Sequence, residues 1–351
     1  MIRVAIIGTG IGAQHLAGYR ALPDRFAVTT LCDLDPERAK SVAGDDPAIA
    51  ITADLDAVLA DPAIDLIDVC LPPHLHFPVS KAALEAGKHV VCEKPLVRSL
   101  AEVDALIAVA EAAGKQVFPV FQYRYGPGTQ QIRALIDAGL AGKPFAASLE
   151  THWNRGPDYY AVPWRGTWAG ESGGAVLGHA IHNHDLLCSV FGPISELSAS
   201  TATRVNEIET EDCGAILLVH ENGALSTSSI TLGAATDSTR LRFTFEGVTA
   251  ESGTAPYAPA EDQWTFTARA PHDQAAIDAV LAGLEAPLAG FAGYFDAIAD
   301  ALEGRGGREV TLQDGRRSIE LVTAVYEAAR TGQRVSLPLS RAAPLYESWL
   351  P

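Results

Sequence analysis

Cysteine is scarce in this sequence, and long apolar runs are absent. Five cysteines occur among 351 residues, and none of them forms a CxxC pair. An odd number of cysteines, mostly within apolar stretches, is typical of reduced thiols in a core, so we expect no disulfide. No apolar segment approaches the roughly 20 residues of a membrane span, and the chain opens on MIRVAIIG without a cleavable leader pattern. We therefore expect a cytoplasmic protein that does not bind membranes.

Basic residues are scarce as well. The chain has 26 lysines and arginines against 43 acidic residues, which gives a formal net charge of -17. Such a charge repels the phosphate backbone of nucleic acids, so we do not expect nucleic acid as a partner. Apolar residues nevertheless make up 48% of the chain. At this length they suffice for the cores of two globular domains.

A glycine-rich turn follows the first predicted strand, residues 3–7. In GTGIGAQHL, Gly8 permits a tight turn, Gly10 lets the backbone approach a pyrophosphate, and Ala13 replaces the third glycine of the GxGxxG pattern. A helix that starts here directs free amides at phosphates. The glycines alone are a weak signal, but the strand before them and the helix after them predict a dinucleotide site.

Asp33 ends the second predicted strand, residues 27–32, and lies 20 residues beyond Ala13. A carboxylate at this place can accept hydrogen bonds from the ribose hydroxyls of adenosine, and it repels a 2′-phosphate. We therefore expect NAD to be preferred over NADP. Arg38 leaves an alternative open, because a nearby cation could hold the phosphate; otherwise Arg38 is an exposed helix residue.

Predicted strands and helices continue to alternate up to residue 121. The strands cover residues 66–70, 89–92 and 116–120, and the helices begin at 36 or cover 79–86 and 100–113. This pattern predicts an α/β fold with a doubly wound parallel sheet, in a Rossmann domain of residues 1–121. Ligands of such sheets bind beyond the carboxyl ends of the strands, where LPPHLH and CEKP lie. The second domain, residues 122–351, has predicted antiparallel strands at 214–219, 224–231 and 240–245 and helices near 291–302 and 318–330.

Five segments resemble the Gfo/Idh/MocA oxidoreductases, which include glucose-fructose oxidoreductase and inositol dehydrogenases. They are VAIIGTGIGAQHL, PPHLHFPVSKAALEAGKHVVCEKPL, FQYRYGP, GGAVLGHAIHNHDLL and YEAARTGQRVSLPL. The resemblance covers nearly the whole chain. It implies a C-terminal α/β domain whose large open, mostly antiparallel sheet often forms the subunit interface, and hence a homodimer or homotetramer.

Lys94, in the CEKP motif, matches the family's active-site lysine, which lies near the nicotinamide and the reacting carbon. A lysine held at the mouth of an apolar strand can polarise a hydroxyl or carbonyl; the alternative is a surface lysine that closes the strand. The resemblance further implies that the cofactor is lined by the side chains of His76, Glu93 and Gln122 and by the backbone of Ile11, Leu71 and Pro73. Gln122 stands where the family often has asparagine.

Three of the ten histidines lie in GHAIHNHD, residues 178–185. Family members often have D-x-x-x-H here, with the aspartate at the place of Gly178 and the histidine at that of His182. At about 100° per residue of an α-helix, His179, His182 and Asn183 share one face. His184 points away from it, so the imidazoles do not converge and we predict no metal site. An imidazole can accept a hydroxyl proton as hydride leaves the same carbon, and we predict this acid/base role for His182. His179 and Asn183 are predicted to contact the substrate, unless they pack the helix, and His184 is predicted to be structural.

The segment HWNRGPDYYAVPWRGTW, residues 152–168, combines aromatic rings, which stack on sugars, with arginines, which bind hydroxyls. The resemblance places Arg165, and Arg124 in FQYRY, near the substrate pocket. Tyr159, Tyr160 and Trp168 are weaker candidates, for which an aromatic core is the alternative.

These residues predict an NAD(P)-dependent dehydrogenase of a sugar, sugar derivative or cyclic polyol, with Lys94 also binding the substrate. One alternative is a lyase or hydrolase in which a retained NAD oxidises the substrate transiently; only the dehydrogenase would produce net NADH. Another is a nucleotide sensor, which would need neither Lys94 nor His182 and is therefore less favoured.

Overall fold

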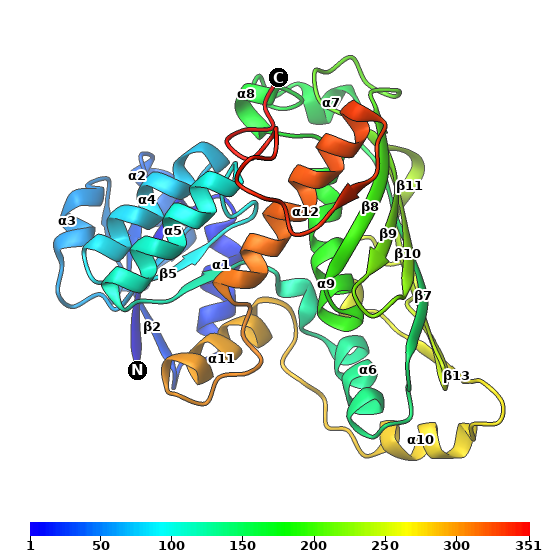
Figure 1. Ribbon diagram of the computed structural model, residues 1–351. Helices are drawn as coiled ribbons and strands as arrows, with labels where there is room; N and C mark the ends of the chain where they lie inside the picture. The colour runs from blue at the N-terminus through cyan, green and yellow to red at the C-terminus, as the bar shows by residue number, and fades with distance from the viewer. The chain divides into compact units, whose positions relative to one another are not determined.

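The computed structural model describes residues 1–351, which divide into two compact units (Figure 1). Unit 1 comprises Met1–Val120 and Phe291–Ile319, and unit 2 comprises Phe121–Gly290 and Glu320–Pro351. A single boundary at residue 121 therefore does not describe the organisation, because residues 291–319 return to the first unit.

Unit 1 is built on a six-stranded parallel sheet in the order β3-β2-β1-β4-β5-β6. Its strands are β1 Ile2–Ile7, β2 Phe26–Cys32, β3 Ala50–Thr52, β4 Leu66–Val69, β5 His89–Cys92 and β6 Val117–Pro119. All four residues of β4 are buried, as expected for a parallel strand covered on both faces. The strand order reverses between β1 and β4, and this confirms the predicted doubly wound sheet.

The helices of unit 1 are α1 Gly12–Arg20, α2 Pro36–Ala43, α3 Leu55–Ala60, α4 Pro73–Glu85 and α5 Leu100–Ala113. Two later helices contribute to this unit as well: α11 Gly290–Leu302, except for Gly290, and α12 Leu312–Thr331, up to Ile319. α4 begins six residues before the predicted helix start, because Pro73 occupies the first turn, where proline is tolerated. α11 packs on α1: Phe295 stacks on Tyr19 with ring centroids 3.7 Å apart. The Tyr294 hydroxyl donates a hydrogen bond to the Phe118 carbonyl at 2.8 Å. α11 thus completes the core of unit 1.

Unit 2 contains an eight-stranded sheet in the order β13-β12-β11-β7-β10-β9-β8-β14. The strands are β7 Pro144–Asn154, β8 Ile194–Ala202, β9 Cys213–His220, β10 Leu225–Thr231, β11 Gly233–Phe245, β12 Val248–Glu251, β13 Thr265–Ala268 and β14 Val335–Ser336. Only β7 and β10 pair in parallel. The sheet is large and mostly antiparallel, as predicted.

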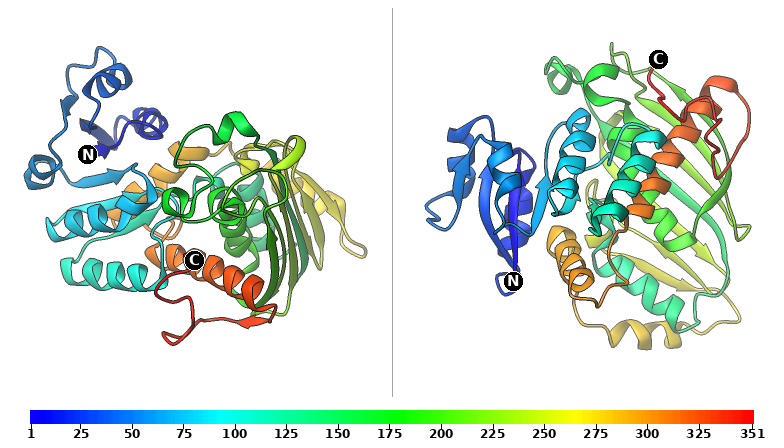
Figure 2. Two further views of the ribbon diagram at one scale, coloured as in Figure 1. Left: turned by 90° about the horizontal axis from the view of Figure 1, so that it is seen from above. Right: turned by 60° about the vertical axis from the view of Figure 1, so that its left-hand side comes forward.

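The remaining elements are η1 Gln122–Arg124, α6 Pro127–Asp137, α7 Pro157–Tyr160, α8 Trp168–Glu171, the π-helical turn η2 Val176–Ala180, α9 Ile181–Phe191, η3 Pro259–Glu261 and α10 Gln274–Ala282. α9 and the unit-2 part of α12 lie on one face of the sheet, and no helix covers the other face (Figures 1 and 2). Residues alternate accordingly along β7, where Leu149 is buried and Ser148 is exposed. No helix in either unit is long and apolar enough to cross a bilayer.

Candidate functional site

The glycine turn between β1 and α1 has the geometry of a phosphate-binding turn. Gly8 has φ 93°, and a Cβ there would lie 2.4 Å from the Cys70 carbonyl oxygen. At Gly10 a Cβ would meet no atom within 4 Å, so the backbone is open to a ligand. Helix and strand approach each other closely at Gly12, where a Cβ would lie 2.8 Å from Ile6. The turn therefore fits a pyrophosphate on the amides that begin α1.

Asp33, directly after β2, is buried and held by several donors. Its carboxylate accepts hydrogen bonds from the Thr9 amide at 2.7 Å, the Thr9 hydroxyl at 2.5 Å and the Asp35 amide at 2.9 Å. The Arg38 guanidinium lies 2.6 Å from Oδ1, the oxygen that accepts the Asp35 amide, so Arg38 pairs with Asp33. Burial opposes ionisation, but the hydrogen bonds from Arg38 and Thr9 outweigh it and hold the pKa of Asp33 well below its usual range. Asp33 is thus a carboxylate at neutral pH.

The loop after β5 contains Glu93, Lys94 and Pro95, and buried side chains hold its backbone in place. Glu93 is 7% exposed and accepts the Lys94 amide on Oε2 at 2.9 Å. Lys94 itself is half-buried. His76, fully buried on α4, has one ring nitrogen 2.6 Å from the Pro95 carbonyl oxygen and the other 2.7 Å from that of Leu71. Its ring therefore clamps the loops after β4 and β5. Burial lowers the pKa of His76, although both carbonyls oppose this.

The buried residue His15 contacts this loop and is itself held by Asp68; neither residue was predicted from the sequence. His15 on α1 lies 2.8 Å from an Asp68 oxygen of β4 and 3.2 Å from Glu93 Oε1. The Cys70 thiol lies 3.4 Å from the same His15 nitrogen as Asp68. A sequence signal existed, because Asp68 interrupts the apolar strand LIDV.

The histidine segment runs from the π-helical turn η2 into α9. Asn183 is completely buried, and its amide donates to the Thr151 hydroxyl of β7 at 2.8 Å. His184 bonds Ser228 of β10 at 2.9 Å, and burial lowers its pKa to about 4. Both side chains therefore face the sheet. His179, beside Trp153, and Asn183, on Thr151, lie against the same buried face of β7 and so share a face, whereas the His182 ring lies on Tyr123.

His179 and His182 have aromatic surroundings. The His182 ring stacks on Tyr123 with centroids 4.5 Å apart, and Phe121 meets it edge-on. His179 meets the Trp153 ring edge-on at 5.3 Å. A Cβ at Gly178 would have no atom within 4 Å, so the place of the family's usual aspartate is open space.

Arg124, predicted to bind the substrate, lies in a buried ion pair. Its guanidinium donates to both oxygens of Asp185 on α9, at 2.7 and 2.6 Å, and the two side chains are 8% and 2% exposed. This geometry gives Arg124 a structural role, holding η1 against α9. Gln122 begins the same 3-10 helix, and its Oε1 is buried without a hydrogen-bond partner.

Arg165, by contrast, forms no ion pair in unit 2. Its guanidinium lies 3.9 Å above the Tyr159 ring, and its Nε is buried without a hydrogen-bond partner. The Tyr159 ring is 6.0 Å from that of His179. The Arg155 guanidinium, 5.3 Å from the Tyr159 ring, is already paired with Asp237 at 2.9 Å. Arg165 is therefore the arginine of this aromatic cluster that has no carboxylate partner in unit 2. Of the weaker candidates, Tyr160 packs against Tyr159 and Trp168 against Tyr326.

Glu211 holds the start of the histidine segment. Its carboxylate accepts the amides of Gly174 and Val176 and the Tyr326 hydroxyl, at 3.0–3.1 Å. Burial raises the pKa of Glu211 to about 7 although these donors oppose it. No sequence motif marked this residue.

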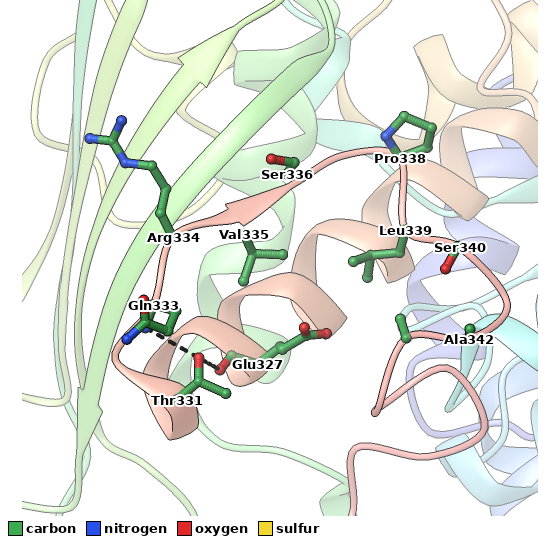
Figure 3. Close-up of a pocket in the computed structure, with 11 residues that line it drawn as sticks. Glu327, Thr331, Gln333, Arg334, Val335, Ser336, Pro338, Leu339, Ser340 and Ala342 are labelled. Atoms are coloured by element: carbon green, nitrogen blue, oxygen red, sulfur yellow. Dashed lines mark hydrogen bonds between the residues drawn. The ribbon is translucent and has the colours of Figure 1, made fainter.

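A pocket of about 490 Å³ lies elsewhere in unit 2, between the end of α12 and the C-terminal segment (Figure 3). Glu327, Arg334 and Leu339 line it, and the Thr331 hydroxyl donates to the Glu327 carbonyl at 2.8 Å. None of the predicted site residues lines this pocket, so it is separate from them.

Residues 2–121 match the family model described as "Oxidoreductase family, NAD-binding Rossmann fold", and residues 129–252 match the GFO/IDH/MocA C-terminal domain. The uncharacterized oxidoreductase YrbE of Bacillus subtilis is 31% identical over 64% of this chain and 65% of its own, so just under two thirds of its length is matched. D-apiose dehydrogenase of Paraburkholderia graminis is 27% identical over 98% of this chain and 92% of its own. The WlbA dehydrogenase of Bordetella pertussis, solved in complex with NADH and UDP-GlcNAcA, matches with a TM-score of 0.83 and 27% identity, over 97% of this chain and 99% of that one.

Proposed function

Because the chain belongs to the Gfo/Idh/MocA oxidoreductase family, we propose that it is an NAD-dependent dehydrogenase of a sugar, sugar derivative or cyclic polyol. The observation that carries this proposal is the arrangement of unit 1. An open phosphate turn at Gly10 and an ionised Asp33 lie at the carboxyl edge of the same sheet from which Lys94 emerges. The proposal is further supported by D-apiose dehydrogenase and by the UDP-GlcNAcA-bound relative.

The roles proposed for the residues follow from their chemistry. NAD, when bound, supplies the carbon that accepts the hydride. The Gly8–Gly12 turn would hold the pyrophosphate, and the ring of the nicotinamide would lie near Lys94 and Gln122. Lys94 would polarise the substrate oxygen, and His182, oriented by the Tyr123 ring, would take the hydroxyl proton. Arg165 and His179 would bind neighbouring hydroxyls, whereas Asn183 would support α9.

A panel of sugars and polyols with NAD, followed by the absorbance of reduced nicotinamide, tests the reaction. We expect NADH to accumulate with at least one substrate, and Lys94→Ala to lower kcat by about 100-fold or more. Lys143→Ala, which removes an exposed lysine of unit 2, is the matched control and should leave the rate unchanged. Full turnover by Lys94→Ala would overturn the assignment, and product without net NADH would indicate a lyase or hydrolase with retained NAD.

The proposed preference for NAD is tested at Asp33. Asp33→Ser removes the carboxylate that repels a 2′-phosphate and releases Arg38 from its ion pair. We expect the ratio of kcat/KM for NADP to that for NAD to rise by about tenfold or more, which initial rates with both cofactors measure. Equal rates with both cofactors in the unchanged protein would contradict the preference.

We also propose that two copies pair through the helix-free face of the unit-2 sheet. This face carries exposed small or apolar side chains, among them Leu217, Leu225, Ser148 and Thr227, and the exposed Arg242 lies beside them. A contiguous face of this kind in a chain of net charge -17 is typical of an interface between subunits.

A further inference from the structure

We propose that His15 and Asp68 are positioning residues that fix Lys94 through Glu93, forming a buried chain of charges from Asp68 to His15 to Glu93 beneath the CEKP loop. The roles proposed above leave these two residues without a function. The inference rests on the proposed function, since it concerns the lysine of that same site.

The three side chains are sealed from solvent and are linked one to the next. His15 and Asp68 are fully buried, and Glu93 is 7% exposed. His15 Nδ1 lies 2.8 Å from Asp68 Oδ2, and its Nε2 lies 3.2 Å from Glu93 Oε1. The other Glu93 oxygen accepts the Lys94 amide at 2.9 Å. Each member therefore has its orientation set by the one before it.

The geometry fits a charged imidazole at the centre. An ionised carboxylate accepts hydrogen bonds, so a ring between two ionised carboxylates carries a proton on both nitrogens. Burial alone would lower the pKa of His15, but the Asp68 carboxylate raises it well above 6.5. Two further groups face the ring: burial raises the pKa of the Cys70 thiol, which is therefore neutral, and Phe291 packs 4.5 Å from the ring. One imidazolium thus bridges two buried carboxylates.

The same geometry argues against a metal ion. Single donor atoms of His15, Asp68 and Cys70 lie within 4.8 Å of one another. The histidine nitrogen among them, however, is used as a hydrogen-bond donor, and the thiol stays protonated. The three side chains form a network of buried charges instead. Removal of any one member would leave a buried charge without its counterion.

The consequence for Lys94 follows from the charge that His15 supplies. With a neutral residue at position 15, Asp68 and Glu93 would face each other without a cation, and Glu93 would turn away or take up a proton. Its bond to the Lys94 amide would then be lost. His76 holds the next residue of the loop through the Pro95 carbonyl, so the loop would stay folded while the lysine loses its alignment.

Two measurements test this without a substrate, on the full chain. In histidine ring ¹⁵N spectra we expect His15 to carry protons on both nitrogens from pH 6 to pH 8; a singly protonated His15 at pH 7 would overturn the proposal.

The second measurement uses His15→Gln, which keeps a hydrogen-bond donor but removes the charge. We expect this variant to change the rate of Lys94 acylation, read by mass spectrometry, by about threefold or more relative to that of Lys143. His220→Gln, a buried histidine of unit 2, is the control and should leave this ratio unchanged. An unchanged ratio in His15→Gln would equally overturn it.

A double-mutant cycle then tests the link in turnover. We expect His15→Gln to lower kcat by about 10- to 100-fold with little change in KM for NAD, because a lysine displaced by about 1 Å loses alignment. In the Lys94→Ala background, the same change should have less than about a twofold effect. Equal effects in both backgrounds would reject the positioning role. Unimpaired turnover of Lys94→Ala alone would reject the proposed function instead.

Discussion

At the scale of single residues, charge pairing decides which polar side chains remain for a ligand. The family resemblance predicts that both Arg124 and Arg165 contact the substrate, yet the two side chains have different surroundings. Arg124 is saturated by a buried carboxylate, whereas Arg165 rests on an aromatic ring without an ion pair. The residue types alone cannot separate them, because the partner, Asp185, is distant in the sequence.

The buried pair provides a stability prediction. Asp185→Asn should lower the free energy of unfolding by about 3 kcal/mol or more, because Arg124 keeps a buried charge without its counterion. Urea unfolding at pH 7 measures this. As the control, Arg334→Gln breaks an exposed pair with Glu196 and should change the same quantity by less than about 1 kcal/mol. Similar losses in both variants would show that the buried pair is no stronger than a surface one.

Glu211 predicts a pH dependence of stability. The folded state holds its proton up to about pH 7, whereas the unfolded chain releases it near 4.5. Stability is therefore lost as the pH rises between these values, by about 3 kcal/mol in total. We expect this loss in the unchanged protein and not in Glu211→Gln, when urea unfolding is compared at pH 5, 6, 7 and 8. Parallel pH profiles for the two proteins would contradict this origin.

At the scale of elements, side chains of the unit-2 sheet hold α9 in place. Asn183 and His184 bond hydroxyls of β7 and β10, and His179 in the preceding π turn lies beside Trp153 of β7. Buried amides need such partners, because an unmet hydrogen bond in a core costs its full desolvation.

Thr151→Val tests how firmly α9 is held. The change keeps the volume but leaves the Asn183 amide without its acceptor, so the free energy of unfolding should fall by about 1–3 kcal/mol. Urea unfolding measures the loss. Thr254→Val, at an exposed position in the loop after β12, is the matched control and should stay within about 0.5 kcal/mol. If both variants behave alike, the bond to Asn183 contributes nothing.

The elements also show what the sequence can and cannot predict. Strands β1 and β5 and helix α5 are predicted nearly to the residue, because apolar runs and a serine cap mark their limits. β8 is missed because ISELSASTA has too few apolar residues to alternate; its strand state depends on its neighbours β9 and β14. The π turn Val176–Ala180 is missed for a related reason, since nothing in the sequence GHAIHNHD marks it.

At the scale of the whole molecule, two features matter: the helix-free sheet face of unit 2 and the discontinuous path of unit 1. The proposed pairing of two copies predicts that a cation on this face disrupts it. Thr227→Arg should convert a dimer to a monomer in sedimentation velocity, because the interface would bury an added charge without a counterion. Gln313→Arg, exposed in unit 1, adds the same charge elsewhere and should leave the mass unchanged. A monomer in the unchanged protein, or a dimer in Thr227→Arg, would contradict the interface.

The return of residues 291–319 to unit 1 has a consequence for biosynthesis. When the ribosome has released residue 120, the sheet of unit 1 is complete, but α11 is not yet made, and the rings of Tyr19 and His15 lack the phenylalanines that cover them. At about 5–20 residues per second, the growing chain waits roughly 10–35 s for that cover. During this interval the nascent nucleotide-binding unit exposes an aromatic surface to the chaperones at the tunnel exit, while the whole of the sheet in unit 2 except β14 is still being synthesised.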